Sequence, residues 1–457
     1  TTAKNRAALM VNFYQANLSH APQRGIIEHM ENTIVQVENG IIAALYRQDD
    51  PKRVSINQNE IIDVRRKGLL LPGFIDLHVH APQFPQLGQA LDVPLEVWLQ
   101  EHTFPLEARY EDIAYAELVY HALVQNLLAN GTTTALYFAT IHSAASLRLA
   151  EICITKGQRA LIGRVAMDLA ETCPDYYRDP SAEESIAATK QFIDIVPTLE
   201  NNNGLVKPVI TPRFIPSCSD EALAAFGDMA KETGAHIQTH CSESDWEHAH
   251  VLERCGKTDT EALYDFGLLN NKTILAHSNF ITDKDMSLIQ KTGAAVAHCP
   301  LSNIYFSNAV FPLRRALEKG IKIGLGTDIS AGPSASLLDT ARSAIACSRL
   351  LEEGVNPQQG SESRGTKNSR IDFQTAFWLA TMGGANSLSL PIGCFEIGRQ
   401  FDAILVSMPP NYAVNNDTID DIGPSDVQLQ KTIMLASKDN IRASWVAGRL
   451  VHGHAHD

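Results

Sequence analysis

The chain has 457 residues, of which 44% are hydrophobic, and its formal net charge is -14. A surface this acidic repels phosphate groups, so we expect neither nucleic acid nor an anionic membrane as a partner. No apolar run approaches the roughly 18 residues that span a bilayer, and the first residues lack the apolar stretch of a secretory signal, so we expect a cytoplasmic protein.

The first segment of the chain has the pattern of β structure. Residues 8–13 and 33–37 are short strand-like runs, and Glu38-Asn39-Gly40 predicts a hairpin turn before residues 41–44.

The eight cysteines of the whole chain contain no CxxC pair, which favours reduced thiols.

The last segment has the same character as the first. Residues 402–406 and 443–451 are strand-like, with a turn at Gly448. We therefore predict that both termini build one small β-sandwich domain, from residues 1–67 and 395–457.

Between these segments, short apolar runs alternate with longer amphipathic stretches. The runs lie at residues 69–76, 132–137, 209–210, 236–240, 273–277, 294–298 and 323–328. The amphipathic stretch 220–232 is followed by Gly234, which is typical of a helix end. This alternation predicts parallel βαβ units, and more than six of them favour a closed (β/α)8 barrel of the α/β class over residues 68–394. The polar stretch 354–369 predicts a surface loop.

Polar residues recur at the carboxyl ends of the predicted barrel strands. They are Asp76, His78, His80, His240, His277 and Asp328. In a (β/α)8 barrel these strand ends open on one face, where active sites lie. Residues far apart in the sequence are therefore expected to meet around one cavity.

His78 and His80 lie two residues apart, which places both imidazoles on the same side of an extended strand. Two such nitrogens can bind one divalent metal ion, and His240 and Asp328 complete a ligand set suited to zinc or iron. A lone His-x-His pair is more often just a pair of polar residues at a strand end. The further polar strand ends favour a metal site.

Glu243 follows His240 by three residues and is expected in the loop beside the metal. A carboxylate there can take a proton from an activated water molecule and pass it to a leaving group. Considered alone, Glu243 is more simply explained as a solvated loop acid. His277 has two interpretations, as a ligand of a second metal or as a neutral base that orients the attacking water.

The fourth predicted strand favours a single metal ion. A binuclear barrel hydrolase of this kind usually needs a carboxylated lysine at the carboxyl end of that strand. Lys207 precedes the apolar residues 209–210, whereas Arg213 lies at the end expected to face the site. Signatures for ATP hydrolysis, serine esterase chemistry and the cytidine-deaminase zinc site are absent from the sequence.

The chain resembles the amidohydrolase superfamily at residues 71–80, Leu-Pro-Gly-Phe-Ile-Asp-Leu-His-Val-His, and again at residues 239–243, 275–277 and 326–328. Within the superfamily it is most similar to the guanine deaminases. The residues that carry this closer similarity are 80–84, 97–99, 103–107, 211–214 and 326–332.

This resemblance implies a (β/α)8 barrel with a β-sandwich from both termini, one zinc ion per subunit and a homodimer. Four residues match the zinc ligands of the family: His78, His80, His240 and Asp328. Glu243 matches the proton shuttle, and His277 matches the residue that polarises the water or the substrate. With Asp328, these two residues form the expected catalytic group.

The resemblance also implies hydrolysis of the exocyclic amine of guanine to give xanthine and ammonia, a step of purine catabolism. Gln83, Arg213 and Phe214 match the contacts to the purine base, beside His240 and Glu243. Arg213 is a forked donor suited to a ring oxo group, and Gln83 can both donate and accept. Without the resemblance, Arg213 fits a structural salt bridge and Phe214 fits core packing.

Two alternatives remain at this point. Another mononuclear member, such as an adenosine-type or S-adenosylhomocysteine-type deaminase or a triazine hydrolase, would share the metal ligands. Arg213 argues against it, because an arginine suits a ring oxo group and offers nothing to an adenine amine. A catalytically inactive barrel scaffold would usually lack metal ligands, and all of them are present in this chain.

Overall fold

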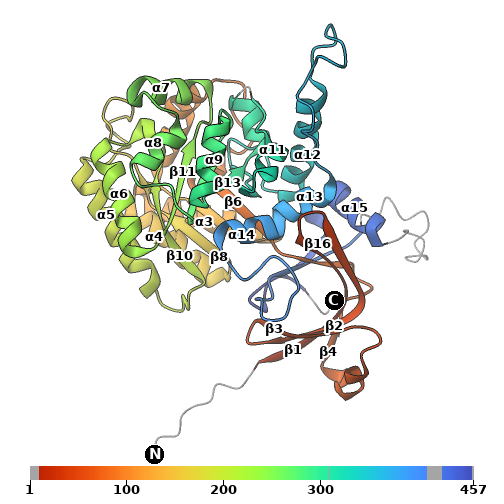
Figure 1. Cartoon of the computed structure of the whole chain (residues 1–457). Coiled ribbons are helices and arrows are strands. Elements are labelled where there is room, and N and C mark those ends of the chain that lie inside the picture. Colours follow the sequence, from red (N-terminus) through yellow and green to blue (C-terminus); the bar gives the residue numbers. More distant parts are fainter. Residues whose placement is uncertain (1–9, 308, 409–424, 455–457) are drawn as a thin grey trace, which may run out of the picture.

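The computed structural model describes residues 10–307, 309–408 and 425–454. These residues form a barrel of parallel strands with helices around it and a mixed sheet built from both ends of the chain (Figure 1). The predicted barrel and the predicted β domain from both termini are thus confirmed. Residues 8 and 9 of the first predicted strand lie outside the described residues, and the domain boundaries stay a prediction.

The barrel strands are neighbours in the ring in the order in which they occur in the chain. They are β6 (Phe74–His80), β7 (Thr132–Phe138), β8 (Arg159–Gly163), β10 (Val206–Pro212), β11 (His236–Cys241), β12 (Thr273–His277), β13 (Ala295–His298) and β14 (Lys322–Leu325). The short strand β9 (Val165–Ala166) pairs with the end of β10. Most residues of these strands are buried, as expected for a parallel sheet whose two faces are both covered.

Helices pack around the strands. The longer ones are α3 (Ile113–Ala129), α4 (Ser143–Lys156), α5 (Ala182–Ile195), α6 (Asp220–Thr233), α7 (Asp245–Cys255), α9 (Asp283–Thr292), α12 (Leu337–Glu353) and α15 (Ser425–Leu435). The shorter ones are α1 (Leu95–Trp98), α2 (Phe104–Ala108), α8 (Asp259–Asp265), α10 (Pro300–Ser302), α11 (Leu313–Glu318), α13 (Phe373–Trp378) and α14 (Gly384–Leu388). The predicted helix at residues 220–232 is confirmed as α6, which begins after the N-cap Ser219 and ends at Gly234 with a φ of 64°.

The ring closes where β14 returns to β6. The Asp328 amide donates to the His78 carbonyl oxygen at 2.9 Å, and the His80 amide donates to the Ile329 carbonyl oxygen at 2.9 Å. The Asp76 carboxylate also accepts from the Thr327 amide at 3.0 Å and from the Thr327 hydroxyl at 2.6 Å. The first and last barrel strands are therefore fixed to each other at the end that carries the predicted site.

The terminal sheet joins strands from both ends of the chain. Along the sheet they are β17 (Arg449–Gly453), β16 (Ile441–Val446), β15 (Ala403–Val406), β5 (Leu69–Pro72), β1 (Val11–Gln23), β2 (Ile26–Glu38) and β3 (Ile41–Tyr46), with β4 (Ile61–Asp63) paired to β1. The predicted turn before residue 41 joins β2 to β3, with Gly40 at a φ of 82°. Tyr14 stacks on Phe401 at 5.1 Å and meets the edge of Trp445 at 5.6 Å, so residues from both termini share one core.

The apolar run 69–76 was expected to be a single barrel strand, and this expectation is wrong. Its first half is β5, which pairs with β1 and β15 in the terminal sheet, and its second half begins β6 of the barrel. Gly73 lies between the two strands, where a Cβ would lie 2.1 Å from the Thr133 hydroxyl oxygen. The run therefore crosses from one sheet to the other at a residue that has no room for a side chain.

The predicted surface loop at residues 354–369 follows α12 and extends away from the barrel, with most of its residues exposed (Figure 1).

The cysteines are all free thiols, and all of them except Cys255 are buried. Within the described residues, the helices are either too short or too polar to cross a membrane.

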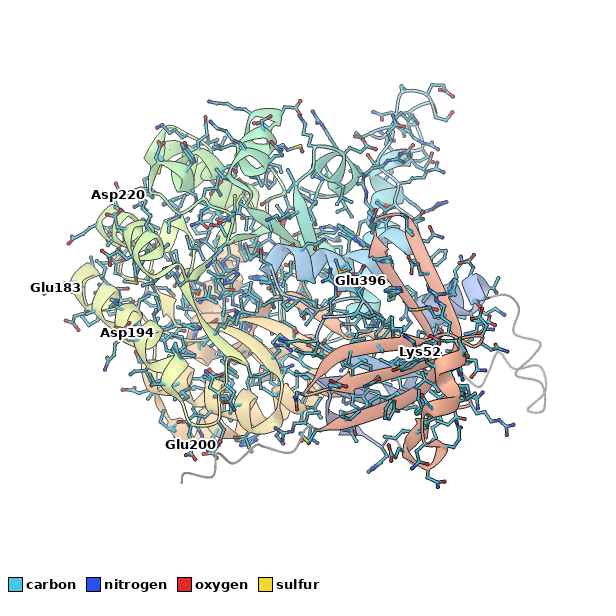
Figure 2. All side chains as sticks on the ribbon, turned by 60° about the horizontal axis from the view of Figure 1, so that its bottom comes forward. Lys52, Glu183, Asp194, Glu200, Asp220 and Glu396 are labelled. Carbon is cyan, nitrogen blue, oxygen red and sulfur yellow. The ribbon has the colours of Figure 1, made fainter. Side chains whose placement is uncertain are left out.

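Acidic side chains point outward from the barrel helices, in keeping with the net charge of -14. Figure 2 labels Glu183 and Asp194 on α5, Glu200 after that helix and Asp220 on α6, and all four residues are exposed. A net negative charge of this size disfavours polyanionic partners.

We predict that an ion pair between the barrel and the segment leading into the terminal sheet stabilises the fold. Arg159 of β8 donates to both carboxylate oxygens of Asp402 at 3.0 Å, and both side chains are buried. Asp402→Asn should lower the free energy of unfolding in urea by about 3 kcal/mol, because it leaves a buried guanidinium without a counter-charge. The control Arg148→Ala removes two partly exposed ion pairs, with Glu117 and Glu151, and should cost less than about 1 kcal/mol. Equal losses in the two variants would contradict this account.

Candidate active site

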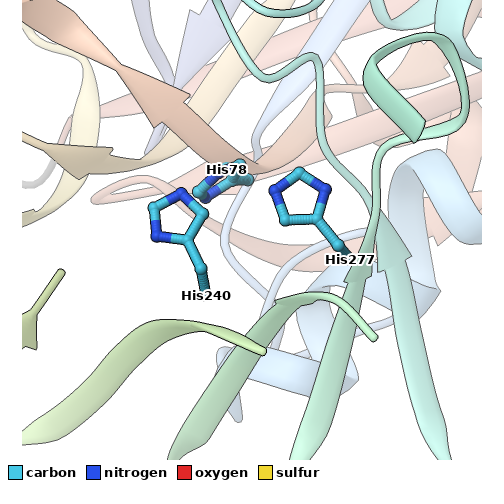
Figure 3. A group of neighbouring side chains, drawn as sticks. All are labelled: His78, His240 and His277. Carbon is cyan, nitrogen blue, oxygen red and sulfur yellow. The ribbon is translucent and has the colours of Figure 1, made fainter. Parts of the chain in front are cut away.

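The polar residues at the strand ends converge on one buried cluster at the mouth of the barrel. His78 and His80 belong to β6, His240 to β11 and His277 to β12, while Asp328 follows β14. Figure 3 shows the imidazoles of His78, His240 and His277 drawn together from different strands. The structure therefore brings together the residues that the sequence analysis selected.

The distances within this cluster are short. The Nε2 atoms of His80 and His240 lie 3.0 Å apart. Asp328 Oδ1 lies 3.3 Å from His78 Nε2 and 3.6 Å from His80 Nε2. Asp328 Oδ2 lies 3.7 Å from His277 Nε2. The most exposed of the five residues, His240, is only 6% exposed, so water screens these groups poorly.

Hydrogen bonds outside the cluster fix the orientation of two of its imidazoles. His240 Nδ1 lies 2.7 Å from the carbonyl oxygen of Arg213, and His277 Nδ1 lies 3.0 Å from Oδ1 of Asn303. Because a carbonyl oxygen can only accept, Nδ1 carries the proton in each ring and Nε2 keeps its lone pair. The Nε2 lone pairs of His240 and His277 are therefore free to bind a metal ion.

The cluster fits a divalent cation. The described part of the chain offers no hydrogen-bond partner to four of its buried atoms, which are Nε2 of His78, Nδ1 of His80, Nε2 of His277 and Oδ1 of Asp328. Buried polar atoms without a partner are costly, and a cation would satisfy several of them together. Two groups of possible ligands, each with its atoms within 4.8 Å of one another, are His78 with His240 and His277, and His78 with His80 and Asp328.

The protonation states of the cluster also suit a cation. Burial, together with the neighbouring His78, holds the pKa of His80 and of His240 well below the ordinary value, so both rings are neutral at pH 7. Burial acts to raise the pKa of Asp328, but His78 and the other histidines hold it well below its ordinary value. Neutral imidazoles and an ionised carboxylate are the forms that bind metals.

Several residues of the site have a left-handed backbone, which is rare outside glycine. The φ angles are 47° at Ser242, 68° at His277, 58° at Ser278 and 52° at Asp328. The Ser278 amide donates to the Cys241 carbonyl oxygen at 2.8 Å, which ties the ends of β11 and β12 together. Residues in this conformation concentrate at functional sites, where the surrounding structure compensates for the strain.

Glu243 lies beside the cluster, as the sequence analysis expected. Its Oε1 is 3.5 Å from Nε2 of His277. Its amide donates to Oε2 of Glu247 at 2.6 Å, and its carbonyl oxygen accepts from Nδ2 of Asn279 at 2.9 Å. Burial and the neighbouring charge of Asp328 raise the pKa of Glu243 to about 8, so this carboxyl can hold or release a proton near neutral pH.

A pocket adjoins the cluster, and its empty space of about 310 Å³ includes the mouth that opens to solvent. Its lining includes the three predicted substrate contacts, Gln83, Arg213 and Phe214, with His80, His240, Glu243, Asp328, Leu95, Trp98, Leu99 and Ala331. Its lining therefore combines apolar side chains with polar groups that converge on one place, as in a small-molecule site. Lys207 lies at the opposite end of β10 from Arg213, as the sequence analysis expected.

The sequence analysis missed residues that form hydrogen bonds to the site residues and hold them in place. Asn303 orients His277, and Asn279 holds the Glu243 loop. Glu107 contacts two residues of the cavity, Arg213 and Gln83. Of these residues, only Glu107 was indicated by the sequence, because it lies in segment 103–107, which resembles the guanine deaminases. Cys299 also lies near His277 and Asp328, but its thiol donates to the Ala297 carbonyl oxygen at 3.6 Å.

Two further histidines, His236 and His298, are buried at barrel strands. His236 Nε2 contacts the Leu388 carbonyl oxygen at 3.1 Å, and the ring of His298 packs on Phe311 at 5.3 Å. Their packing supports a structural role.

Comparisons with known proteins agree with this geometry. The chain is 36% identical to the guanine deaminase of Dictyostelium discoideum, over 98% of this chain and 99% of that protein. It is 39% identical to the guanine deaminase of Homo sapiens, over 86% of this chain and 85% of that protein.

A solved structure, the guanine deaminase of C. acetobutylicum with guanine bound in its active site, superposes with a TM-score of 0.87. It is 30% identical in sequence, and the superposition covers 97% of this chain and all of that one. The model of the Amidohydrolase family matches residues 69–451. With its barrel, its buried histidines and this match, the chain belongs to the amidohydrolase family.

Proposed function

We propose that this chain is a guanine deaminase, which hydrolyses guanine to xanthine and ammonia with the help of one bound metal ion. The observation that carries the proposal is a pocket between a His/Asp cluster with Glu243 on one side and an arginine held by a buried carboxylate on the other. The relatives from Dictyostelium discoideum and Homo sapiens, which match most of the chain, have the same activity by name. A direct test is ammonia release with guanine, adenine, cytosine and 8-oxoguanine offered in parallel. Release from adenine but not from guanine would contradict the assignment.

We assign the metal to His78, His80, His240 and Asp328 and propose that it is zinc. Three imidazole nitrogens with one carboxylate form a ligand set that zinc accepts, and iron is the alternative. A divalent cation bound there would supply Lewis acidity, which would make a water molecule easier to deprotonate near neutral pH. The protein contributes neutral imidazoles, burial of the ligand atoms and outer hydrogen bonds that keep the rings in place.

Glu243 transfers the protons of the reaction, and His277 orients the attacking water. The oxygen of water forms a bond to C2 of guanine, and Glu243 takes the proton that the water loses. Glu243 passes this proton to N3. It then takes the remaining proton from the oxygen now bonded to C2 and gives it to the amine at C2, so that the C2–N bond breaks, the C2 carbonyl of xanthine forms and ammonia leaves. His277, with its proton on Nδ1 held by Asn303, turns a neutral Nε2 toward Glu243 and Asp328 and orients the water.

Arg213, Gln83 and Phe214 bind the base. The guanidinium is a charged donor suited to the O6 acceptor of guanine, and the Gln83 amide can donate and accept along the ring edge. Phe214 is 4% exposed and lies across the cavity wall from the imidazole of His240, with ring centroids 6.1 Å apart. An aromatic ring in that place can pack against a purine face.

We further propose a cytoplasmic homodimer that serves purine catabolism. These three points follow from the resemblance to the guanine deaminases and from the acidic composition of the chain.

We predict that Asp328→Ala releases the metal. The substitution removes the only carboxylate of the assigned ligand set, so metal content measured by atomic emission should fall well below one ion per chain. The control His121→Ala alters a half-exposed histidine of α3 and should keep the wild-type content. A variant without Asp328 that still holds one ion per chain would refute the assignment.

Glu243→Gln is expected to separate metal binding from turnover. The amide cannot take up a proton, so kcat should fall by about 10²- to 10⁴-fold. Metal content should stay at the wild-type level. Glu253→Gln, an exposed residue of the neighbouring helix α7, is the matched control and should leave kcat unchanged. A Glu243→Gln variant with normal kcat would rule out the proton-shuttle role.

Arg213→Ala tests the substrate assignment. Loss of a charged hydrogen bond to O6 should raise KM for guanine by about 10- to 100-fold. The control Arg314→Ala removes an exposed arginine that pairs with Glu318 on α11, and KM should not change. If Arg213→Ala turns over guanine with an unchanged KM, the base is held in some other way.

A further inference from the structure

We infer that Glu107 is a positioning residue, which holds the Arg213 guanidinium and the Gln83 amide in the orientation that the purine edge requires. The inference rests on the proposed function and adds to it a residue that does not line the cavity. It assigns Glu107 an effect on the recognition of the ring oxo group, and none on the metal or on the proton transfers.

Glu107 lies at the centre of a buried hydrogen-bond network. Its Oε2 accepts from Nη1 of Arg213 at 2.7 Å and from the Tyr177 hydroxyl at 2.6 Å. Its Oε1 accepts from Nη2 of Arg213 at 3.1 Å and from Nε2 of Gln83 at 2.8 Å. Glu107 is fully buried, so all of these bonds are made away from water.

The two bonds to Arg213 fix the plane of its guanidinium. Both terminal nitrogens are held by one carboxylate, which is the forked geometry that gives such pairs their directionality. The Phe104 ring lies 5.0 Å from the guanidinium carbon and limits movement out of this plane. The N–H groups that Glu107 does not engage are therefore held in one direction.

Glu107 also decides which way the Gln83 amide is turned. Nε2 of Gln83 donates to Glu107, and Oε1 accepts from the Ser330 amide at 3.1 Å. A reversed amide would place its oxygen against the carboxylate and its nitrogen against an N–H donor, so that both bonds would be lost. The base therefore meets a fixed arrangement of donor and acceptor on Gln83.

The charge of Glu107 explains how an arginine can be buried in this pocket. An isolated guanidinium at this depth carries a large desolvation cost, whereas a closely hydrogen-bonded carboxylate compensates for it. The pair has no net charge. Arg213 can therefore offer directional donors to a neutral purine without attracting anions in general.

The test compares guanine with 2-aminopurine, which keeps the C2 amine but lacks the oxo group at C6. KM and kcat are measured for guanine, and 2-aminopurine is measured as an inhibitor of guanine turnover. Glu107→Gln should raise KM for guanine by about 100-fold, because Arg213 loses its charged partner. The Ki of 2-aminopurine should rise about tenfold less than KM for guanine, because 2-aminopurine makes no bond to a donor at C6 and can lose only the contact with Gln83.

Tyr177→Phe provides a milder change that is compatible with folding. It removes one hydrogen bond to Oε2 of Glu107 and leaves Arg213 and Gln83 intact. We expect KM for guanine to rise by about fivefold, with kcat within about twofold of wild type. The matched control is Tyr120→Phe, which alters a fully buried tyrosine of α3 whose hydroxyl has no hydrogen-bond partner among the described residues. This control should leave both constants unchanged.

The outcomes separate the inference from the proposed function. A wild-type protein that releases no ammonia from guanine would overturn the proposed function. Normal wild-type turnover, with a rise in the Ki of 2-aminopurine equal to the rise in KM for guanine, would show a merely structural role for Glu107 and overturn the inference. Unchanged kinetics in Tyr177→Phe would overturn it as well, and that result stands even if Glu107→Gln does not fold.

Discussion

The closure of the barrel between β6 and β14 is the constraint on which the rest of the site depends. The Asp328 amide donates to the His78 carbonyl oxygen, and Asp76 binds both the amide and the hydroxyl of Thr327. These bonds place the carboxylate of Asp328 beside the imidazoles of β6, although the residues lie far apart in the chain. Because the ends of parallel strands open on one face, β11 and β12 add their histidines to the same point.

Arg213 connects the His/Asp cluster to the cavity. Its carbonyl oxygen orients His240, while its side chain reaches Glu107 and the cavity. A displacement of the end of β10 would therefore disturb the proposed metal ligand and the proposed base contact together. The proposed role of Glu107 extends this coupling to α2, which carries no residue that lines the cavity.

The sequence predicts much of this arrangement because strand ends follow a simple rule. His78, His240, His277 and Asp328 were selected as polar residues after apolar runs, and the barrel brings them together. Their roles as ligands and catalysts stay predictions. The exchange of sheets at Gly73 was not predicted, because two buried strands separated by one glycine look like one longer strand. The contact of Glu107 with Arg213 was not predicted either, since no local pattern indicates which distant partner a buried carboxylate will meet.

The central claim is that one cation held by this cluster enables turnover of guanine. The most direct measurement removes metal with a chelator and follows ammonia release from guanine while zinc is added back in known amounts. The account predicts no activity in the metal-free protein and a linear rise that ends at one equivalent per chain. Full activity without metal, or a rise that continues to two equivalents, would contradict it.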